Sequence, residues 1–180
     1  MSVKQVKNIL NLDTLSIIKK NNRDVFIKQI NNLQKSKEFW NYKIIQFSND
    51  VSIYNLPTDS LEFDLIKKDI DKLNLEVNIQ GIMYYYWQPG SYIPWHNDGI
   101  YSNSITIYLN NKWDYSEGGL FLYKDGNDIK TIIPSDNLGV IQTGGVEHST
   151  TITNTESPIR KTIQIFLNDK KHNTLLWKHL

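Results

Sequence analysis

Cysteine is absent from this sequence of 180 residues. Its absence excludes disulfide bonds, zinc sites built on thiolates and catalytic thiols. Any metal bound by the chain must therefore be held by histidine, carboxylate and water. A chain without cysteine also fits a reducing compartment, and the abundance of Asn, Ile and Lys is typical of AT-rich bacterial or viral genomes. We expect a cytoplasmic protein, in a bacterial cell or in a virus-infected host cell.

The chain also lacks an excess of either charge, since 20 Lys and Arg stand against 19 Asp and Glu, a formal net charge of +1. Without a strong basic field it has little with which to bind a phosphate backbone. No run approaches the roughly 18 apolar residues that a membrane span needs, and residues 1–15 lack the apolar core and cleavage site of a signal peptide. We expect neither nucleic acid nor a membrane as a partner.

The first third of the chain has the periodicity of helices. Apolar residues recur mainly at spacings of three and four in two stripes, which are Val25, Phe26, Ile30 and Leu33, and then Phe63, Ile66, Ile70 and Leu73. Asp59 precedes Glu62 by three positions, a pattern typical of a helix N-cap. We expect these helices, within about residues 1–75, to pack against a sheet.

From Val77 onward the apolar period changes to two, and β-branched and aromatic residues, which favour strands, become frequent. Turn-forming residues separate seven predicted strands: 77–87, 104–109, 119–124, 129–133, 138–142, 149–153 and 161–167. Short strands at such spacing are typical of a sandwich or jelly roll. We therefore predict one domain, mainly β with N-terminal helices, whose jelly-roll core spans about 77–168. A tail over 169–180 would carry a short helix.

His96 and Asp98 have the spacing of two ligands to one metal ion. In an extended segment, residues two apart project from the same face, so both side chains can reach a shared ion while Asn97 points away. His148 would add a third ligand from a facing strand. Two histidines and one carboxylate leave part of an octahedral shell open and suit iron(II), although manganese or zinc could use the same ligands. The alternative is a chance pairing of a surface histidine with an ordinary aspartate.

Further residues around this pattern make the sequence resemble the 2-oxoglutarate- and iron(II)-dependent oxygenases. The likeness is to the prolyl-4-hydroxylase-like group, and within it to the hypoxia-sensing prolyl hydroxylases, over about half the chain. It is carried by Tyr86, Pro89-Gly90, His96-x-Asp98, Tyr108-Leu109-Asn110, Trp113-Asp114, Gly118-Gly119-Leu120, His148, Arg160, Ile163 and Phe166. The resemblance implies a distorted double-stranded β-helix, a cupin-like jelly roll, with the metal at one mouth and helices supporting the larger sheet.

The resemblance also implies that the iron ligands are His96, Asp98 and His148. It implies that Arg160 anchors the distal carboxylate of 2-oxoglutarate, and that the hydroxyl groups of Tyr108 and Tyr86 contact the same cosubstrate. A guanidinium binds a carboxylate through two parallel charge-assisted hydrogen bonds and stays charged when partly buried. Strand alternation puts Arg160 and Lys161 on opposite faces, so only one can enter the pocket. Collagen-type relatives use lysine for this role, but the spacing to Ile163 and Phe166 favours Arg160.

The activity implied by the resemblance is that of a dioxygenase dependent on iron(II), 2-oxoglutarate and O2, with ascorbate as an optional supporting reductant. It would hydroxylate a protein or peptide side chain, with proline favoured, and would need no catalytic residue beyond the metal centre. Asp98 argues against a halogenase, which lacks this carboxylate, and Phe166 stands where nucleic-acid dealkylating relatives carry a second arginine. Trp95 either lines the substrate entrance or covers the core. The alternatives are a hydroxylase of a free amino acid or other small molecule, and a jelly roll that binds without catalysis.

Overall fold

The computed structural model describes residues 2–30, 51–98 and 103–169, except for the side chains of 22–30 and 169. Its elements, in chain order, are β1 (Ser2–Lys7), α1 (Leu12–Ile30), β2 (Val51–Asn55), α3 (Leu61–Asp71), β3 (Val77–Trp87), β4 (Ile93–His96), β5 (Asn103–Tyr108), the 3-10 turn η1 (Tyr115–Glu117), β6 (Phe121–Asp125), β7 (Asp128–Ile132), β8 (Leu138–Thr143), β9 (His148–Thr150) and β10 (Arg160–Asp169). Neither α1 nor α3 is long and apolar enough to cross a membrane.

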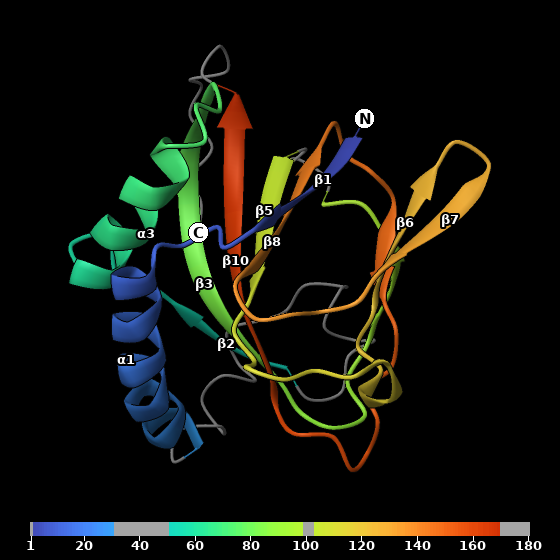
Figure 1. Ribbon diagram of the computed structural model, residues 1–180, viewed down its shortest axis with the longest axis horizontal. Coiled ribbons are helices and arrows are strands. Elements are labelled where there is room, and N and C mark those ends of the chain that lie inside the picture. Colours follow the sequence, from blue (N-terminus) through green and yellow to red (C-terminus); the bar gives the residue numbers. More distant parts are fainter. Residues whose placement is uncertain (1, 31–50, 99–102, 170–180) are drawn as a thin grey trace, which may run out of the picture.

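The described strands form two antiparallel sheets (Figure 1). The larger has the strand order β1-β8-β5-β10-β3-β2, and the smaller has the order β4-β9-β6-β7. From β4 to β10 the chain passes back and forth between the sheets, which is the connectivity of a jelly roll. The predicted fold class, mainly β with N-terminal helices and a double-stranded β-helix, is confirmed.

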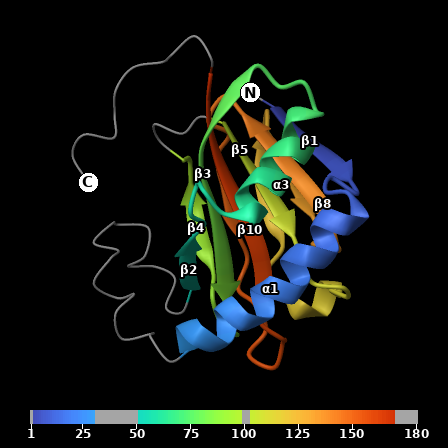
Figure 2. The same ribbon diagram turned by 90° about the vertical axis from the view of Figure 1, so that its left-hand side faces the viewer.

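The outer face of the larger sheet is apolar and lies under the helices. Ile105 and Ile107 of β5 and Ile163 and Ile165 of β10 are completely buried in one cluster, together with Ile66 of α3. Figure 2 shows α1 and α3 lying across this sheet. Burying an isoleucine side chain stabilises a fold by about 1.5–3 kcal/mol, so this cluster fixes the helices to the sheet.

The inner face of the same sheet, which is turned toward the smaller sheet, carries many polar side chains. Thr106 of β5 pairs with Gln164 of β10 and donates a 2.7 Å hydrogen bond to its side-chain oxygen. Ser104, two residues earlier on β5, pairs with Gln142 of β8. Because buried polar groups are costly unless they are hydrogen-bonded, such pairs allow the interior to be polar without losing stability.

The predicted alternation along β10 matches the structure. Ile163 belongs to the outer cluster, whereas Gln164 pairs with Thr106 of the inner face. Arg160 continues the inner series, and Lys161 continues the outer one. Arg160 therefore lies on the face of β10 that is turned toward the smaller sheet, and Lys161 lies on the opposite face.

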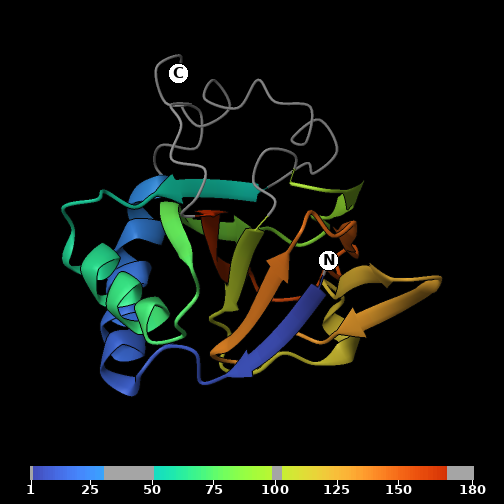
Figure 3. The same ribbon diagram turned by 90° about the horizontal axis from the view of Figure 1, so that it is seen from above.

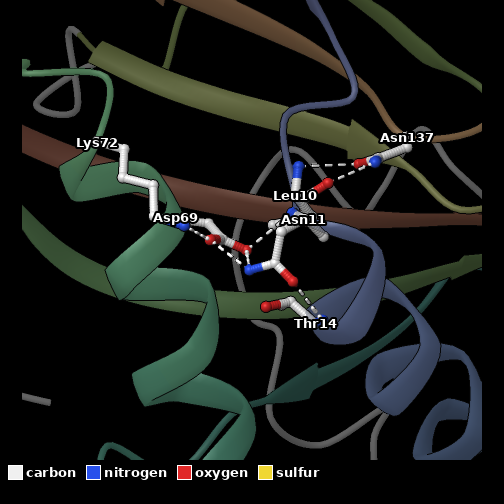
Figure 4. A network of polar contacts seen from close by, with 6 residues as sticks. All are labelled: Leu10, Asn11, Thr14, Asp69, Lys72 and Asn137. Carbon is white, nitrogen blue, oxygen red and sulfur yellow. Dashed lines mark hydrogen bonds and ion pairs between the residues drawn. The ribbon is translucent and has the colours of Figure 1, made fainter.

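A buried aspartate joins the beginning of α1 to α3 (Figure 4). Asp69 is 2% exposed and accepts hydrogen bonds from the backbone N–H of Asn11 (3.0 Å), from the Asn11 side chain (2.7 and 2.8 Å) and from Lys72 (2.6 Å). Burial would raise the pKa of Asp69, but the bonds from Lys72 and Asn11 outweigh it and hold the pKa below its usual value. The Asn11 side chain also accepts from the backbone N–H of Thr14 (2.9 Å), capping α1.

The described part of the first third of the chain contains two strands, β1 and β2, which its periodicity did not predict. β1 and β2 are the two edge strands of the larger sheet, and β1 pairs with β8 along its whole length (Figure 3). The N-cap of α3 is Ser60, which accepts from the backbone N–H of Phe63, and not Asp59 as predicted. β4 was likewise not among the predicted strands. The apolar stripe over 25–33 and the predicted helix of the tail lie outside the described side chains and residues.

Candidate metal centre

Three side chains with metal-binding atoms meet between the two sheets, at the ends of β4 and β9. His96 is the last residue of β4, His148 is the first of β9, and the two are cross-strand partners. Asp98 follows β4 by two residues. Its Oδ1 atom lies 3.8 Å from the Nε2 atoms of both histidines. The structure thus brings together the predicted ligand set, with all three ligand atoms within 4.8 Å of one another.

Both histidines are oriented by backbone carbonyl groups. His96 Nδ1 lies 2.7 Å from the carbonyl oxygen of Pro94, and His148 Nδ1 lies 2.8 Å from that of Val146. A carbonyl oxygen can only accept, so each Nδ1 carries a proton, and in the neutral form of the imidazole the lone pair is then on Nε2, the atom that faces Asp98. Metal-binding histidines are held by this kind of second hydrogen bond, which fixes both tautomer and ring orientation.

The surroundings of His148 favour its neutral form. The residue is 6% exposed, and its ring stacks on that of Phe121, with ring centroids 5.3 Å apart. Burial lowers the pKa of His148 below its usual value, Asp98 opposes this shift, and the neighbouring His96 adds to it. Because a histidine must lose its proton to bind a metal, this environment prepares the ring for that role.

The carboxylate of Asp98 has two different surroundings. Its Oδ1 atom faces the histidines, whereas Oδ2 accepts a 3.0 Å hydrogen bond from the hydroxyl of Ser104 on β5. Ser104 in turn accepts a 3.2 Å hydrogen bond from the side-chain amide of Gln142 on β8. Sequence reasoning missed both residues. The one signal in the sequence was their position in the alternation of β5 and β8, which puts each of them on the inner face of its strand.

Arg160 is a buried cation without a hydrogen-bonded anion. The residue is 1% exposed, and its guanidinium carbon lies 4.6 Å from the ring centroid of Trp87 and 5.1 Å from that of Tyr108. Neither Nε nor Nη1 of Arg160, nor the hydroxyl of Tyr108, has a hydrogen-bond partner among the described residues. Burial lowers the pKa of Arg160, and the adjacent Tyr108 opposes that shift. Burial also raises the pKa of Tyr108, so its phenol stays protonated as a possible donor.

A backbone of unusual shape leaves space for this arginine. Gly119 has a φ of +59°, and a Cβ atom built there would lie 2.9 Å from Cδ of Arg160 and 2.9 Å from Cγ2 of Thr153. The preceding Gly118 also has a positive φ, of +67°. Glycine adopts such dihedral angles without steric cost, and Gly119 meets a second requirement, because a side chain there would collide with Arg160.

The structure does not bring Tyr86 to this space, which corrects its predicted role. Tyr86 is fully buried in the outer apolar cluster under the helices. Its neighbour Trp87 is the cross-strand partner of Arg160, so the inner face of β3 belongs to Tyr85 and Trp87. Sequence reasoning missed Trp87 because a shift of one residue along a strand changes the face.

Trp95 lies next to the centre but on the other face of β4 from His96. It is 39% exposed, and the ammonium group of Lys124 lies 5.8 Å from the centroid of its ring. Lys124 also forms a 2.6 Å ion pair with Glu147, the residue before His148. Trp95 therefore belongs to the exterior next to the metal centre and is not a core residue.

No protein-family model and no curated protein matches the chain, but solved structures do. A prolyl-4-hydroxylase from Pseudomonas putida has a TM-score of 0.66 at 15% identity, covering 93% of this chain and 92% of that one. A prolyl hydroxylase from Trichoplax adhaerens, in complex with a peptide fragment of hypoxia inducible factor, has a TM-score of 0.68 at 16% identity, covering 94% and 84%. This chain has the fold of the 2-oxoglutarate oxygenases.

This chain is also similar to a solved structure that has a small molecule bound in place of a peptide. HygX from Streptomyces hygroscopicus, with nickel, 2-oxoglutarate and hygromycin B bound, has a TM-score of 0.64 at 10% identity, covering 93% of this chain and 83% of that one. Identities this low support the fold alone. The roles of individual residues in this chain therefore depend on the geometry of its own site.

Proposed function

We propose that this chain is an iron(II)- and 2-oxoglutarate-dependent dioxygenase that hydroxylates a protein or peptide side chain, with proline as the favoured residue. His96, Asp98 and His148 would hold the iron, and Arg160 would bind the distal carboxylate of 2-oxoglutarate beside Tyr108. When bound, iron and 2-oxoglutarate supply the activation of O2 that adds one oxygen atom to a C–H bond of the substrate, while 2-oxoglutarate becomes succinate and carbon dioxide.

The proposal rests on the buried guanidinium of Arg160, two of whose nitrogens have no hydrogen-bond partner among the described residues. An ionised group removed from water is costly unless it is paired, and here Nε and Nη1 have no hydrogen-bond partner among the described residues. A carboxylate would satisfy two of the N–H groups at once. The neighbouring hydroxyl of Tyr108, also without a partner, could donate to the same anion. Arg160 and Tyr108 would thus form an anion-binding point besides the three metal-binding groups.

The relative positions of these groups fit a short dicarboxylate. Ser104, which contacts Asp98, and Tyr108, which contacts Arg160, lie on the same face of β5. Four residues of a strand span roughly 13 Å. In the proposed arrangement, one end of a five-carbon diacid would bind at the metal-binding groups and its other carboxylate would meet Arg160, with the side chains on either side spanning the rest of this distance. The rings of Trp87 and Tyr108 would exclude water from that carboxylate.

The donor set also fits iron(II). Two neutral imidazoles and one carboxylate form the facial arrangement that non-haem iron oxygenases use, with coordination positions left for other ligands. The chain supplies no thiolate that would favour zinc or copper. Its histidines are fixed through their Nδ1 atoms, so the protein's part is to hold this geometry, bind the cosubstrate and exclude water.

The peptide substrate is supported by the two prolyl hydroxylases among the similar structures, one of them with a peptide bound. A second candidate, hydroxylation of a small molecule, is favoured by the comparable TM-score of HygX with hygromycin B bound. Incubating the iron-loaded protein and 2-oxoglutarate with proline-containing peptides, and separately with small-molecule extracts, tests both. A mass gain of one oxygen atom on a peptide, with equal formation of succinate, supports the first, and such a gain only on a small molecule supports the second.

The cosubstrate site has a sharper test. Titration calorimetry of the manganese-loaded protein with 2-oxoglutarate should show that Arg160→Gln weakens binding by about 100-fold, because two hydrogen bonds to a charged group, worth about 1.5 kcal/mol or more each, are lost. Lys161→Ala is the matched control, since this neighbour faces the other side of β10 and should leave the affinity nearly unchanged. If the two variants bound 2-oxoglutarate equally well, Arg160 would not be its anchor.

A further inference from the structure

A hydrogen-bonded chain leads from the larger sheet to the metal-binding carboxylate. Gln142 of β8 and Ser104 of β5 are cross-strand partners, and both are 2% exposed or less. The amide nitrogen of Gln142 lies 3.2 Å from the Ser104 hydroxyl, which lies 3.0 Å from Oδ2 of Asp98. We propose that Ser104 and Gln142 are positioning residues that hold Asp98 so that a single oxygen, Oδ1, binds the metal. This inference rests on the proposed iron site.

The direction of each hydrogen bond in this chain is determined by chemistry. An ionised carboxylate only accepts, so the single proton of the Ser104 hydroxyl must point to Asp98. With that proton committed, Ser104 can only accept from its other neighbour, and the amide group of Gln142 is the donor. Hydrogen bonds in such a series polarise and strengthen one another. Gln142 therefore fixes the Ser104 rotor, and Ser104 fixes the carboxylate.

The two oxygens of Asp98 consequently differ. Oδ1 is 3.8 Å from both histidine Nε2 atoms and has the position of a metal ligand, whereas Oδ2 is directed to Ser104. A carboxylate that used both oxygens would occupy one more coordination position. Holding Oδ2 away from the metal keeps that position open, which an oxygenase needs for its cosubstrate and O2. Residues that orient metal ligands typically change metal affinity by 10–100-fold when they are altered.

The test is the affinity for Mn(II) alone, measured by calorimetry and independent of turnover. Ser104→Ala should weaken Mn(II) binding by about 10-fold or more, and Ser104→Thr, which keeps the hydroxyl, should restore it. Gln142→Met should weaken binding less, because it acts only through Ser104. The double variant should then bind no more weakly than Ser104→Ala. This lack of additivity distinguishes a relay from two separate structural effects.

Thr106→Val is the matched control. Thr106 lies on the same strand and face as Ser104 but bonds to Gln164, so its loss should leave Mn(II) affinity unchanged. Circular dichroism and thermal unfolding of every variant identify those that fail to fold, and if Ser104→Ala is one of them, Gln142→Met and Ser104→Thr decide the question. Wild-type affinity in folded Ser104→Ala or Gln142→Met, or strictly additive losses, would overturn the relay. A wild-type protein that bound no Mn(II) would instead overturn the proposed iron site.

Discussion

Replacing Asp69 by alanine should lower the free energy of unfolding by about 3 kcal/mol. The change removes the acceptor for the backbone N–H and the side-chain amide of Asn11, which lie 2.7–3.0 Å from the carboxylate. Each hydrogen bond to a charged group contributes about 1.5–3 kcal/mol. Lys72 adds little, because its side chain is 58% exposed and such ion pairs contribute about 0–1 kcal/mol. Since Asn11 caps α1, the loss should also loosen the contact between α1 and α3.

Urea denaturation followed by circular dichroism measures this loss. Asp71→Ala is the control on the same helix, because its partner Lys67 and Asp71 itself are about half exposed, and it should cost no more than about 0.5 kcal/mol. Asp69→Asn, which keeps the volume and one acceptor oxygen, should fall between the two. The reasoning would be refuted if Asp69→Ala were no more destabilising than Asp71→Ala.

The same contact predicts a pH dependence with a definite sign. The pKa of Asp69 is lowered in the folded protein, so its contribution is complete above the unfolded value of about 3.9 and is lost as the pH falls through the lower folded value. The difference in stability between the wild-type protein and Asp69→Asn should therefore be constant near neutral pH and shrink in strong acid. A difference that grew as the pH fell would contradict the assignment.

Two further predictions concern the site. His148→Ala should weaken Mn(II) binding by at least about 100-fold in calorimetry, a larger effect than the loss of an orienting residue, while Thr150→Ala on the same short strand should not; equal affinities would exclude His148 as a ligand. Gly119→Ala should weaken binding of 2-oxoglutarate by about 10-fold without changing Mn(II) affinity, because its Cβ would lie 2.9 Å from Arg160 Cδ and its φ is +59°; wild-type binding of 2-oxoglutarate would show that the arginine does not need this space.

The sequence predicts the central strands well because their burial leaves a strong pattern. β3 has the predicted bounds, since eleven residues rich in β-branched and aromatic side chains can hardly form anything else. The edge strands β1 and β2 leave no such pattern: β1 has only Val3 and Val6 partly buried, at a spacing of three. Such a segment becomes a strand because β8 offers it a partner along its whole length, which is long-range information.

The site divides in the same way. The predicted metal-binding residues His96, Asp98 and His148 do lie together, because the type of each residue is dictated by its chemistry, and the role of Arg160 stays a prediction. Residues whose importance depends on the strand face or on the cross-strand partner, such as Ser104 and Gln142, were not predicted. Tyr86 was assigned to the wrong face of β3, because nothing in a run of aromatic residues says which of them points inward. The contact of Ser104 with Gln142 depends on the register of β5 against β8, which the sequence of neither strand contains.

The hydrogen bonding of the polar side chains between the two sheets differs from one end of this space to the other. Between the sheets, polar groups such as Thr106, Gln164, Ser104 and Gln142 bond to one another or to Asp98. At the Arg160 end, three buried atoms of Arg160 and Tyr108 have no partner among the described residues. An unpaired buried guanidinium destabilises a fold by several kcal/mol unless something compensates it. Because these four neighbours bond to one another or to Asp98, a guanidinium with two unpartnered nitrogens in the same space suits a molecule that arrives with its own negative charge.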